Sequence, residues 1–347
     1  MRSSNVLGLQ AERAEWDRAH STPDLAAEAA APAPRREPSE RLANVERLRI
    51  VAMLEIVTFH VGGAVGSDDY RLPLVGGLGL PVFLLLNNAF NCTLTERMGT
   101  RAFLDLKVSR LVLPWLIWSG IYAGMVVAEK VRHEEPLADA FSPWMIIGGT
   151  YSHLWFVPFA LFGSLLIAGL QARTKEVSHR LMAGLTLGLG CAVVLVAAWL
   201  LHVEEIQWPL LQWLFALPSP LLGFALGRVL MSRDRRLLRG LAALLSVVAV
   251  VTLAAALIWS VPEMDRRYAV SMALVGLFFL LPGKADALSR RLTPLLFGMY
   301  LIHPLLVRVY QGAHLPGVPV ALLGVLVFLS AALLVELLRR SPLKRLV

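Results

Sequence analysis

The sequence predicts an all-α integral membrane protein with about ten transmembrane helices and with both termini in the cytoplasm. The first supporting observation is the composition, because 56% of the 347 residues are hydrophobic, 17% are charged and the mean hydropathy is +0.63. These values lie outside the range that is usual for soluble domains. The other two observations are the lengths of the apolar segments and the charges of the loops between them.

Apolar segments follow one another along the whole chain after its first residues. Each has roughly the 20 residues that a helix needs to cross about 30 Å of hydrocarbon. The segments lie at 46–66, 74–94, 108–128, 152–171, 181–201, 209–231, 238–259, 267–283, 294–311 and 318–338. The segment at 267–283 is the shortest. An even number of crossings places the two termini on the same side of the membrane.

The loops between these segments alternate in charge. Lys and Arg gather in every second loop, which is typical of cytoplasmic loops. The basic segments are the N-terminal tail, 97–110, 173–180, 228–239, 284–291 and the residues after 336; the opposite loops contain Asp68, Asp69, Glu134, Glu135, Glu204, Glu205, Glu263 and Asp265. The net charge of +8 is therefore a topology signal and does not indicate nucleic-acid binding.

The chain divides into three parts by composition. Residues 1–44 are rich in Ala, Pro, Glu and Arg, which predicts a disordered cytoplasmic tail without the apolar region of a signal peptide. Residues 45–340 form the predicted transmembrane domain, and 341–347 form a short cytoplasmic C-terminal tail. Cys92 and Cys191 fall in separate apolar segments, so they indicate neither a disulfide framework nor a metal motif.

The first apolar segment, RLRIVAMLEIVTFH, carries ionisable residues inside a predicted membrane helix. Arg49 and His60 are eleven positions apart, which places them within about 20° on one helix face and roughly 16 Å apart along its axis. Glu55 lies about 140° away from His60 around the helix. An ionisable side chain at membrane depth is costly unless it faces the bundle or water, so each one is a functional candidate.

Simpler interpretations exist for each of these residues. Arg49 alone is also typical of a snorkelling anchor, and His60 alone is typical of a hydrogen bond between packed helices. Lys107 and Arg110 lie three positions apart, one helix turn, so both can face one ligand, although each alone is also a common topology anchor. The spacing of Arg49 and His60 favours a functional role for the pair.

Four segments form an ordered set of motifs. They are Arg49 followed by ten residues and His60; RAFLDLKVSRLVLPWLIWS with Lys107 and Arg110; HLWFVPFALF at 153–162; and GMYLIHPLL at 298–306. The set resembles the acyltransferase 3 family of integral membrane acyltransferases over about residues 45–310. Two segments depart from the family pattern: Asn87 and Asn88 replace a Ser-Gly dipeptide, and Lys107 replaces an arginine, which keeps the charge but loses bidentate geometry.

The resemblance implies transfer of an acyl group, usually acetyl, from acetyl-CoA or another acyl-CoA to a hydroxyl of a carbohydrate or glycolipid of the cell envelope. Arg49, Lys107 and Arg110 would then contact the phosphates of the donor at the cytosolic mouth. His60 lies deeper, where a neutral imidazole can take the proton of the acceptor hydroxyl or carry the acyl group covalently. No metal is expected.

Five further residues are candidates for acceptor binding or for support of His60. His303 is expected at a depth similar to that of His60, with Tyr300 one turn away on the same face; both are also compatible with plain helix packing. Trp155 either belongs to an interfacial aromatic belt or shapes the acceptor pocket. Asn87 follows from the departure described above, and the partner of Glu55 is open.

The rival interpretation is a proton-coupled transporter or flippase, because many spans with buried Arg, Glu and His also describe such carriers. A carrier is expected to gather its ionisable groups around a midplane site in broken helices, whereas here the basic residues gather below one histidine. A purely structural scaffold leaves the Arg49 and His60 face without a purpose. We expect the protein in the cytoplasmic membrane of a bacterium, with a sugar hydroxyl, an amine or a lipid-linked precursor as acceptor and with its oligomeric state open.

Overall fold

The computed structural model describes residues 40–66, 77–281, 283, 286–313 and 317–347, and every regular element in these residues is a helix. The elements are α3 (Glu40–Val65), α4 (Gly79–Met98), α5 (Thr100–Arg132), η1 (Leu137–Ala140), α6 (Met145–Gly148), α7 (Phe156–Arg173), α8 (His179–Val203), α9 (Leu210–Ala216), α10 (Ser219–Ser232), α11 (Arg235–Ile258), α12 (Glu263–Leu280), α13 (Ala287–Leu292), η2 (Thr293–Leu295), α14 (Leu296–Gly312), α15 (Val320–Arg340) and η3 (Lys344–Leu346). The predicted all-α class is confirmed.

Each of the ten predicted spans coincides with a helix or a helix pair. In the described residues, eight segments are long and apolar enough to cross a membrane. Helices α4 and α12, with 20 and 18 residues, match the two other predicted spans, so the count of ten stays a prediction there. Helix α3 begins at Glu40, which assigns residues 40–44 to a helix and not to the predicted tail. Residues 1–39 of that tail lie outside the described residues.

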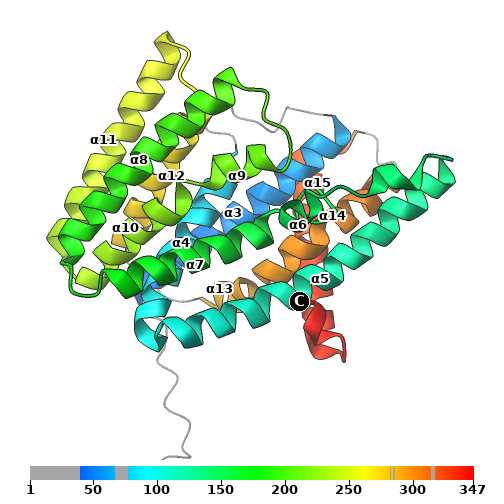
Figure 1. Cartoon of the computed structure of the whole chain (residues 1–347), viewed down its shortest axis with the longest axis horizontal. Coiled ribbons are helices and arrows are strands. Elements are labelled where there is room, and N and C mark those ends of the chain that lie inside the picture. The colour runs from blue at the N-terminus through cyan, green and yellow to red at the C-terminus, as the bar shows by residue number, and fades with distance from the viewer. Residues whose placement is uncertain (1–39, 67–76, 282, 284–285, 314–316) are drawn as a thin grey trace, which may run out of the picture. The chain divides into compact units, whose positions relative to one another are not determined.

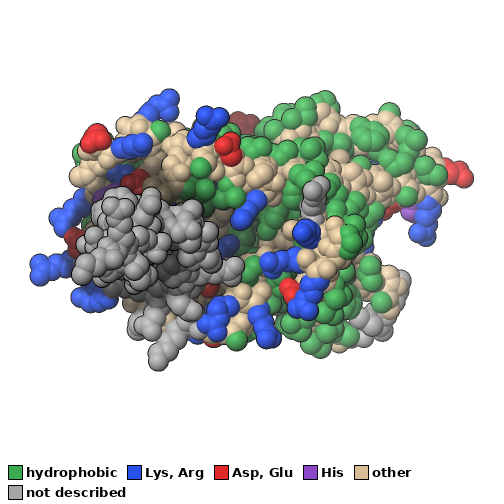
Figure 2. All heavy atoms as spheres, turned by 90° about the horizontal axis from the view of Figure 1, so that it is seen from below, with side chains coloured by type: hydrophobic (Ala, Val, Ile, Leu, Met, Phe, Trp, Pro, Cys, Tyr) green, Lys and Arg blue, Asp and Glu red, His purple; other side chains and the backbone are tan. Residues whose placement is uncertain are grey.

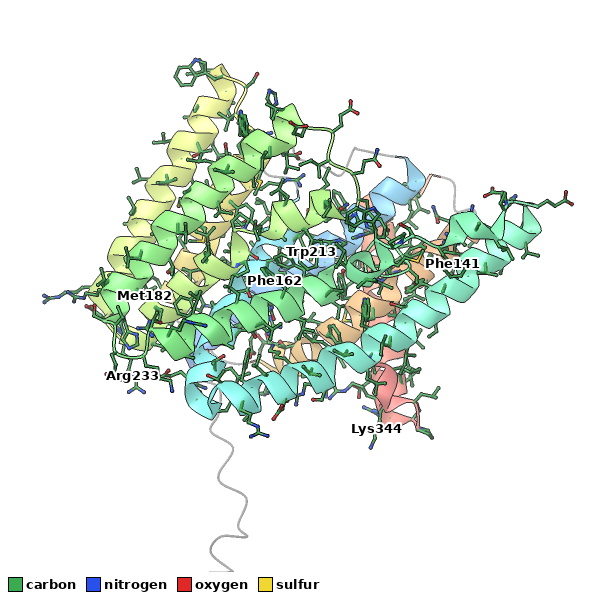
Figure 3. The ribbon with its side chains drawn as sticks, viewed as in Figure 1. Phe141, Phe162, Met182, Trp213, Arg233 and Lys344 are labelled. Atoms are coloured by element: carbon green, nitrogen blue, oxygen red, sulfur yellow. The ribbon has the colours of Figure 1, made fainter. Side chains whose placement is uncertain are left out.

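The two ends of the helices differ in charge, as the loops predict. Figure 1 shows the α4–α5, α7–α8 and α10–α11 turns at one end and the connections that follow α8 and α11 at the other. We call the first the basic end: the view of this face in Figure 2 shows Lys and Arg spread around it, and Figure 3 places Arg233 and Lys344 there. We call the other the acidic end, because Glu134, Glu204 and Glu263 belong to it.

Helix α4 is the buried centre of the bundle, packed against α3, α7, α10 and α12. Gly223 of α10 lets the two helices approach closely, because a Cβ there would lie 2.5 Å from Cβ of Asn88. The amide of Asn88 donates to Oγ of Ser219 at 3.3 Å, and that of Asn91 donates to Oγ of Ser164 at 3.2 Å. Polar contacts between helices therefore pair the amide N–H groups of two asparagines in the buried part of α4.

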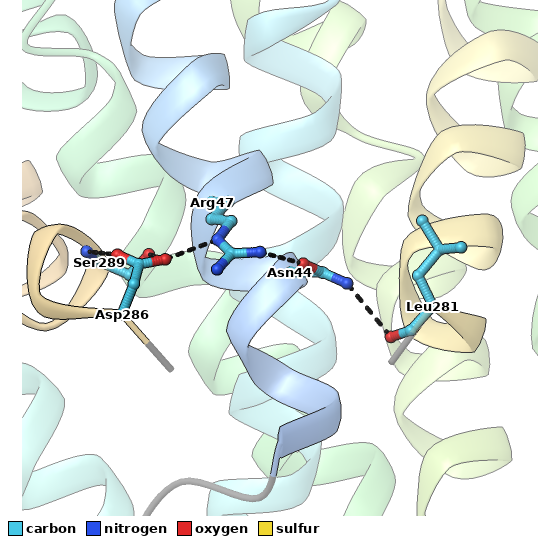
Figure 4. Close-up of polar contacts among 5 residues, drawn as sticks. All are labelled: Asn44, Arg47, Leu281, Asp286 and Ser289. Carbon is cyan, nitrogen blue, oxygen red and sulfur yellow. Dashed lines mark hydrogen bonds and ion pairs between the residues drawn. The ribbon is translucent and has the colours of Figure 1, made fainter. Parts of the chain in front are cut away.

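The start of α3 is fixed at the basic end by a polar chain that Figure 4 shows. Arg47 donates to the Asp286 carboxylate at 2.6 Å and to Asn44 at 2.7 Å, and Asn44 donates to the Leu281 carbonyl at 3.4 Å. Asp286 also accepts from the backbone N–H of Ser289 at 2.7 Å and so caps α13. The Ser289 N–H and the Arg47 guanidinium lower the pKa of Asp286 to about 2.

Candidate functional site

His60 lies near the acidic end of α3, and one hydrogen bond fixes the proton on its ring. Its Nδ1 lies 2.8 Å from the carbonyl oxygen of Ile56, one turn earlier in the helix. A carbonyl oxygen only accepts, so Nδ1 of the neutral ring carries the hydrogen and Nε2 carries the free lone pair. His60 is thereby prepared to accept a proton at Nε2.

Two more histidines surround His60. The ring of His303 in α14 lies 4.9 Å from that of His60, and the ring of His153 lies 5.6 Å from that of His303. His303 donates from Nδ1 to the Tyr300 carbonyl at 2.8 Å, and His153 donates from Nε2 to the Leu301 carbonyl at 3.3 Å. Among the described residues, Nε2 of His303 and Nδ1 of His153 have no hydrogen-bond partner. All three imidazoles therefore have one unprotonated nitrogen.

The sequence analysis did not select His153, although it is the first residue of the motif HLWFVPFALF. The structure holds it in place from α14: the hydroxyl of Tyr300 donates to the backbone carbonyl of His153, and their rings lie 5.5 Å apart. Of the two predicted candidates, His303 lies beside His60, and Tyr300 lies beside His303. The histidine at the start of the motif was the available signal for the third member.

A cavity of about 610 Å³ lies beside this cluster toward the acidic end. Its walls come from α3, α8, α9, α12 and the segment before α7, and they include His60, His153 and Trp155. Trp155 is buried and packs edge-on against Phe159, at 5.9 Å between the ring centroids. The side chain predicted either as interfacial or as pocket-forming is therefore part of a cavity wall. We call this space the acidic-end cavity.

Glu55, whose partner the sequence left open, binds the start of α4. Its two oxygens accept from the backbone N–H groups of Gly77 at 2.8 Å and Gly79 at 2.9 Å. Gly77 has a φ of +75°, which favours glycine, and a Cβ on Gly79 would collide with the Glu55 carboxylate. The charge of Arg267 also acts on the Glu55 carboxylate, and Glu55 lines the acidic-end cavity. Its position indicates a structural contact at the rim of the site.

Arg49 lies in the half of α3 that is nearer the basic end, and its side chain packs against α4. Its guanidinium carbon is 5.7 Å from the ring centre of Phe83 and 5.6 Å from that of Phe90. Asn87 is four residues after Phe83 and three before Phe90, so it shares the α4 face that Arg49 contacts. In the described part of the chain, Nε of Arg49 is buried without a hydrogen-bond partner.

Lys107 and Arg110 of α5 belong to the same electrostatic group as Arg49, because the charges of both arginines act on the Lys107 ammonium. Lys107 also lies 5.5 Å from the ring centre of Phe103. No ion pair of these three cations is formed within the described residues. The three predicted donor-binding residues thus form one cluster, which we call the basic cluster; it does not line the acidic-end cavity.

Aromatic rings connect the basic cluster to the histidines. The Arg49 guanidinium packs on the ring of Phe83, whose centre lies 5.8 Å from that of the Phe156 ring. The centre of the Phe156 ring lies 4.9 Å from that of the Tyr300 ring. Tyr300 in turn lies 5.8 Å from His303. The two candidate regions are therefore the ends of one contiguous row of side chains from α3, α4, α7 and α14.

A second network, absent from the sequence-based predictions, supports the histidines from the other side. Arg308 donates from Nε to the hydroxyl of Tyr151 at 2.8 Å and from NH1 to Glu129 at 2.9 Å. Tyr151 stacks on Tyr122 at 4.7 Å, and Tyr122 donates to the Leu301 carbonyl at 2.8 Å. Both tyrosine rings lie edge-on to His153, at 5.7 and 5.0 Å. The network fixes the segment that carries His153.

The described residues contain no group of three or more His, Cys, Asp or Glu side chains with the geometry to hold a metal ion. Cys92 is buried and Cys191 is exposed, and both are free thiols.

The chain thus has long apolar helices, a histidine with a free lone pair beside a cavity and a separate cluster of cations. The comparison with protein families identifies the class. A family model of acyltransferase 3 type, described as an acyltransferase domain, matches residues 42–338. The chain therefore belongs to the acyltransferase 3 family and is a membrane acyltransferase, as its motifs predict. The comparisons with curated proteins and with solved structures each find no significant match.

Proposed function

We propose that this acyltransferase moves an acyl group, acetyl in the first instance, from acyl-CoA to a hydroxyl of a carbohydrate or glycolipid acceptor. The observation that carries the proposal is the hydrogen bond from Nδ1 of His60 to the Ile56 carbonyl. In the neutral ring it leaves Nε2 of this cavity-lining residue with a free lone pair. A single row of aromatic contacts joins His60 to the basic cluster. This arrangement separates a site for an anionic donor from a site for a hydroxyl-bearing acceptor.

The donor is placed at the basic end because its phosphates need cations. Arg49, Lys107 and Arg110 can supply charge-assisted hydrogen bonds and form no ion pair within the described residues, although the charge of Glu46 acts on Arg49. The thioester then has to reach His60, which lies roughly 16 Å from Arg49 along α3. An extended pantetheine arm follows the row that includes Phe83 and Phe156.

In the reaction at His60, one proton leaves the acceptor hydroxyl and ends on the sulfur of CoA. The acceptor hydroxyl gives its proton to Nε2 of His60 while its oxygen forms a bond to the thioester carbonyl carbon. The C–S bond of the tetrahedral intermediate then breaks, and the imidazolium returns the proton to the sulfur of the departing CoA. A covalent acyl-His60 intermediate is the alternative, and it differs in giving ping-pong kinetics.

The other residues are assigned roles by their contacts. His303 lies beside His60 and Tyr300 holds the backbone of His153, so both support the His60 ring. Trp155 forms an acceptor wall, Asn87 lies on the α4 face beside Arg49, and Glu55 holds the start of α4. We place the basic end in the cytoplasm of a bacterium, where acyl-CoA is made, and the bilayer around the apolar helices.

The test is acceptor-dependent thioester consumption by the purified protein in lipid nanodiscs. His60→Ala is expected to lower turnover by about 10²–10⁴-fold, the usual contribution of a general base. His133→Ala is the matched control, since His133 is exposed in the α5–η1 connection. Equal thermal unfolding of both variants excludes misfolding. Near-normal turnover of His60→Ala would remove the base assignment.

A transporter or flippase is the alternative, and proteoliposomes distinguish it from an enzyme. It would move a labelled acceptor across the bilayer without consuming thioester. The acyltransferase family of the chain favours the enzyme.

A further inference from the structure

The polar side chains that line the acidic-end cavity include both acceptors and donors of hydrogen bonds. Nε2 of His60 carries a lone pair, and the hydroxyl of Ser152 and the amide of Gln212 can each donate as well as accept. All three residues line the cavity. A ligand that carries several hydroxyl groups can form hydrogen bonds with such a lining.

The cationic side chain in the cavity wall, Arg267, is already neutralised. Arg267 forms an ion pair with Glu263, one turn earlier in α12. Its charge also interacts with the charge of the Glu55 carboxylate. Its guanidinium also lies 5.9 Å from the ring centre of Phe215 and packs against Gly77. With two carboxylates against one guanidinium, the Glu and Arg side chains of the lining carry a net negative charge, and His202 is the further lining residue that can become positive.

The remaining wall is apolar and aromatic. Trp155, Phe59 and Phe215 line it, and the volume of about 610 Å³ is of the size that takes one small ligand. Flat aromatic faces pack well against the C–H face of a ring whose edge carries hydroxyl groups.

From these observations, and resting on the proposed function, we propose that the moiety that enters the acidic-end cavity is an uncharged, hydroxyl-rich ring, and that acidic sugars are rejected. A carboxylate or phosphate inside would lose its hydration and would meet the carboxylates of Glu55 and Glu263, and the Arg267 guanidinium is already paired with Glu263. A phosphate that links the acceptor to a lipid would have to stay outside the cavity.

The test compares methyl glucoside with methyl glucuronide, in which a carboxylate replaces the C6 hydroxymethyl group, and the uncharged methyl ester of the glucuronide controls for the lost hydroxyl. Binding of each is measured on the donor-free protein by thermal stabilisation, and transfer is measured with acetyl-CoA. We expect stabilisation by the two uncharged compounds only, and a kcat/KM for transfer at least about tenfold lower for the glucuronide.

Two variants change the features that carry the inference. Glu263→Gln releases Arg267 from its ion pair and is expected to reduce the discrimination against the glucuronide several-fold. Glu336→Gln is the matched control, because it removes another ion pair between residues four apart, with Arg340, at the end of α15. Gln212→Leu is expected to weaken glucoside binding, and Gln207→Leu, at an exposed position, is its control.

The outcomes separate this inference from the proposed function. Glucoside binding without acetyl transfer would support the cavity's preference and remove the proposed function. Transfer to glucoside and glucuronide with equal kcat/KM would overturn the preference and keep the proposed function. Binding of neither ring, or equal discrimination in wild type and Glu263→Gln, would also overturn the preference.

Discussion

Both ends of the protein place arginine beside the row of candidate residues, but they use it differently. Arg49 at the basic end lies on phenyl rings, and within the described residues its cluster has no ion pair. Arg267 at the acidic end is paired with Glu263 and faces Glu55. An unpaired guanidinium keeps its hydrogen-bonding capacity for a ligand, whereas a paired one is largely spent on the fold. The difference supports the proposal of an anionic donor at the basic end and a neutral acceptor at the acidic end.

The largest expected effect on this comparison comes from Arg49→Ala. The variant removes the deepest cation of the basic cluster, so kcat/KM for acyl-CoA is expected to fall by about 10²-fold, with part of the loss recovered in Arg49→Lys. Arg101→Ala provides the control, because Arg101 is exposed in the first turn of α5. The measurement is kcat/KM for acyl-CoA of each purified variant. Identical donor kinetics in Arg49→Ala and wild type would make Arg49 a topology anchor.

A smaller effect is expected at the mouth of the donor site. Lys107→Ala and Arg110→Ala should each raise KM for acyl-CoA by roughly tenfold, and the loss should depend on salt because charges near an open mouth are partly screened. The measurement is KM at two ionic strengths with CoA and dephospho-CoA thioesters. If these residues meet the 3′-phosphate, the dephospho donor is affected less. A KM that neither substitution changes would exclude them from the donor site.

The basic cluster and the histidines around His60 also show which contacts can be predicted from the sequence alone. Helix periodicity was sufficient for the all-α class and for the pairing of Tyr300 with His303, because these relations are local. The shared face of Arg49 and His60 stays a prediction. The contact of Glu55 with Gly77 depends on where the chain turns back between helices. The bond between Tyr151 and Arg308 joins positions 157 residues apart, and the bond from His153 to Leu301 spans 148. Such contacts depend on how distant helices pack, which no local pattern specifies.

Arg308 tests whether the network around Tyr151 positions the histidines. Arg308→Met removes the bonds to Tyr151 and Glu129, so the segment that carries His153 should loosen and kcat should fall by about three- to tenfold with KM for the donor unchanged. Arg308→Lys should restore part of kcat through its charge. Arg132→Met, an exposed position in the last turn of α5, is the matched control. A change in KM alone would contradict a positioning role.

The smallest expected effect concerns Asp286, which belongs to the fold of the basic end. Its pKa of about 2 lies below the ordinary value of 3.8, so its charge stabilises the folded state above about pH 4, and this contribution is lost as the pH falls toward 2. Asp286→Asn keeps a helix cap but loses the ion pair with Arg47. Thermal unfolding should show a small loss of stability at pH 6 that shrinks by pH 3, with activity near wild type. A loss that is independent of pH would contradict the ion-pair explanation.

The central claim is that donor and acceptor reach His60 from opposite ends of the bundle. Proteoliposomes test it directly, because acetyl-CoA and methyl glucoside are both polar and do not cross a bilayer unaided. With acetyl-CoA outside and the glucoside trapped inside, we expect acetylated glucoside to accumulate in the lumen; with both outside and an empty lumen, we expect no product. Efficient transfer when both substrates are on one side would contradict the account.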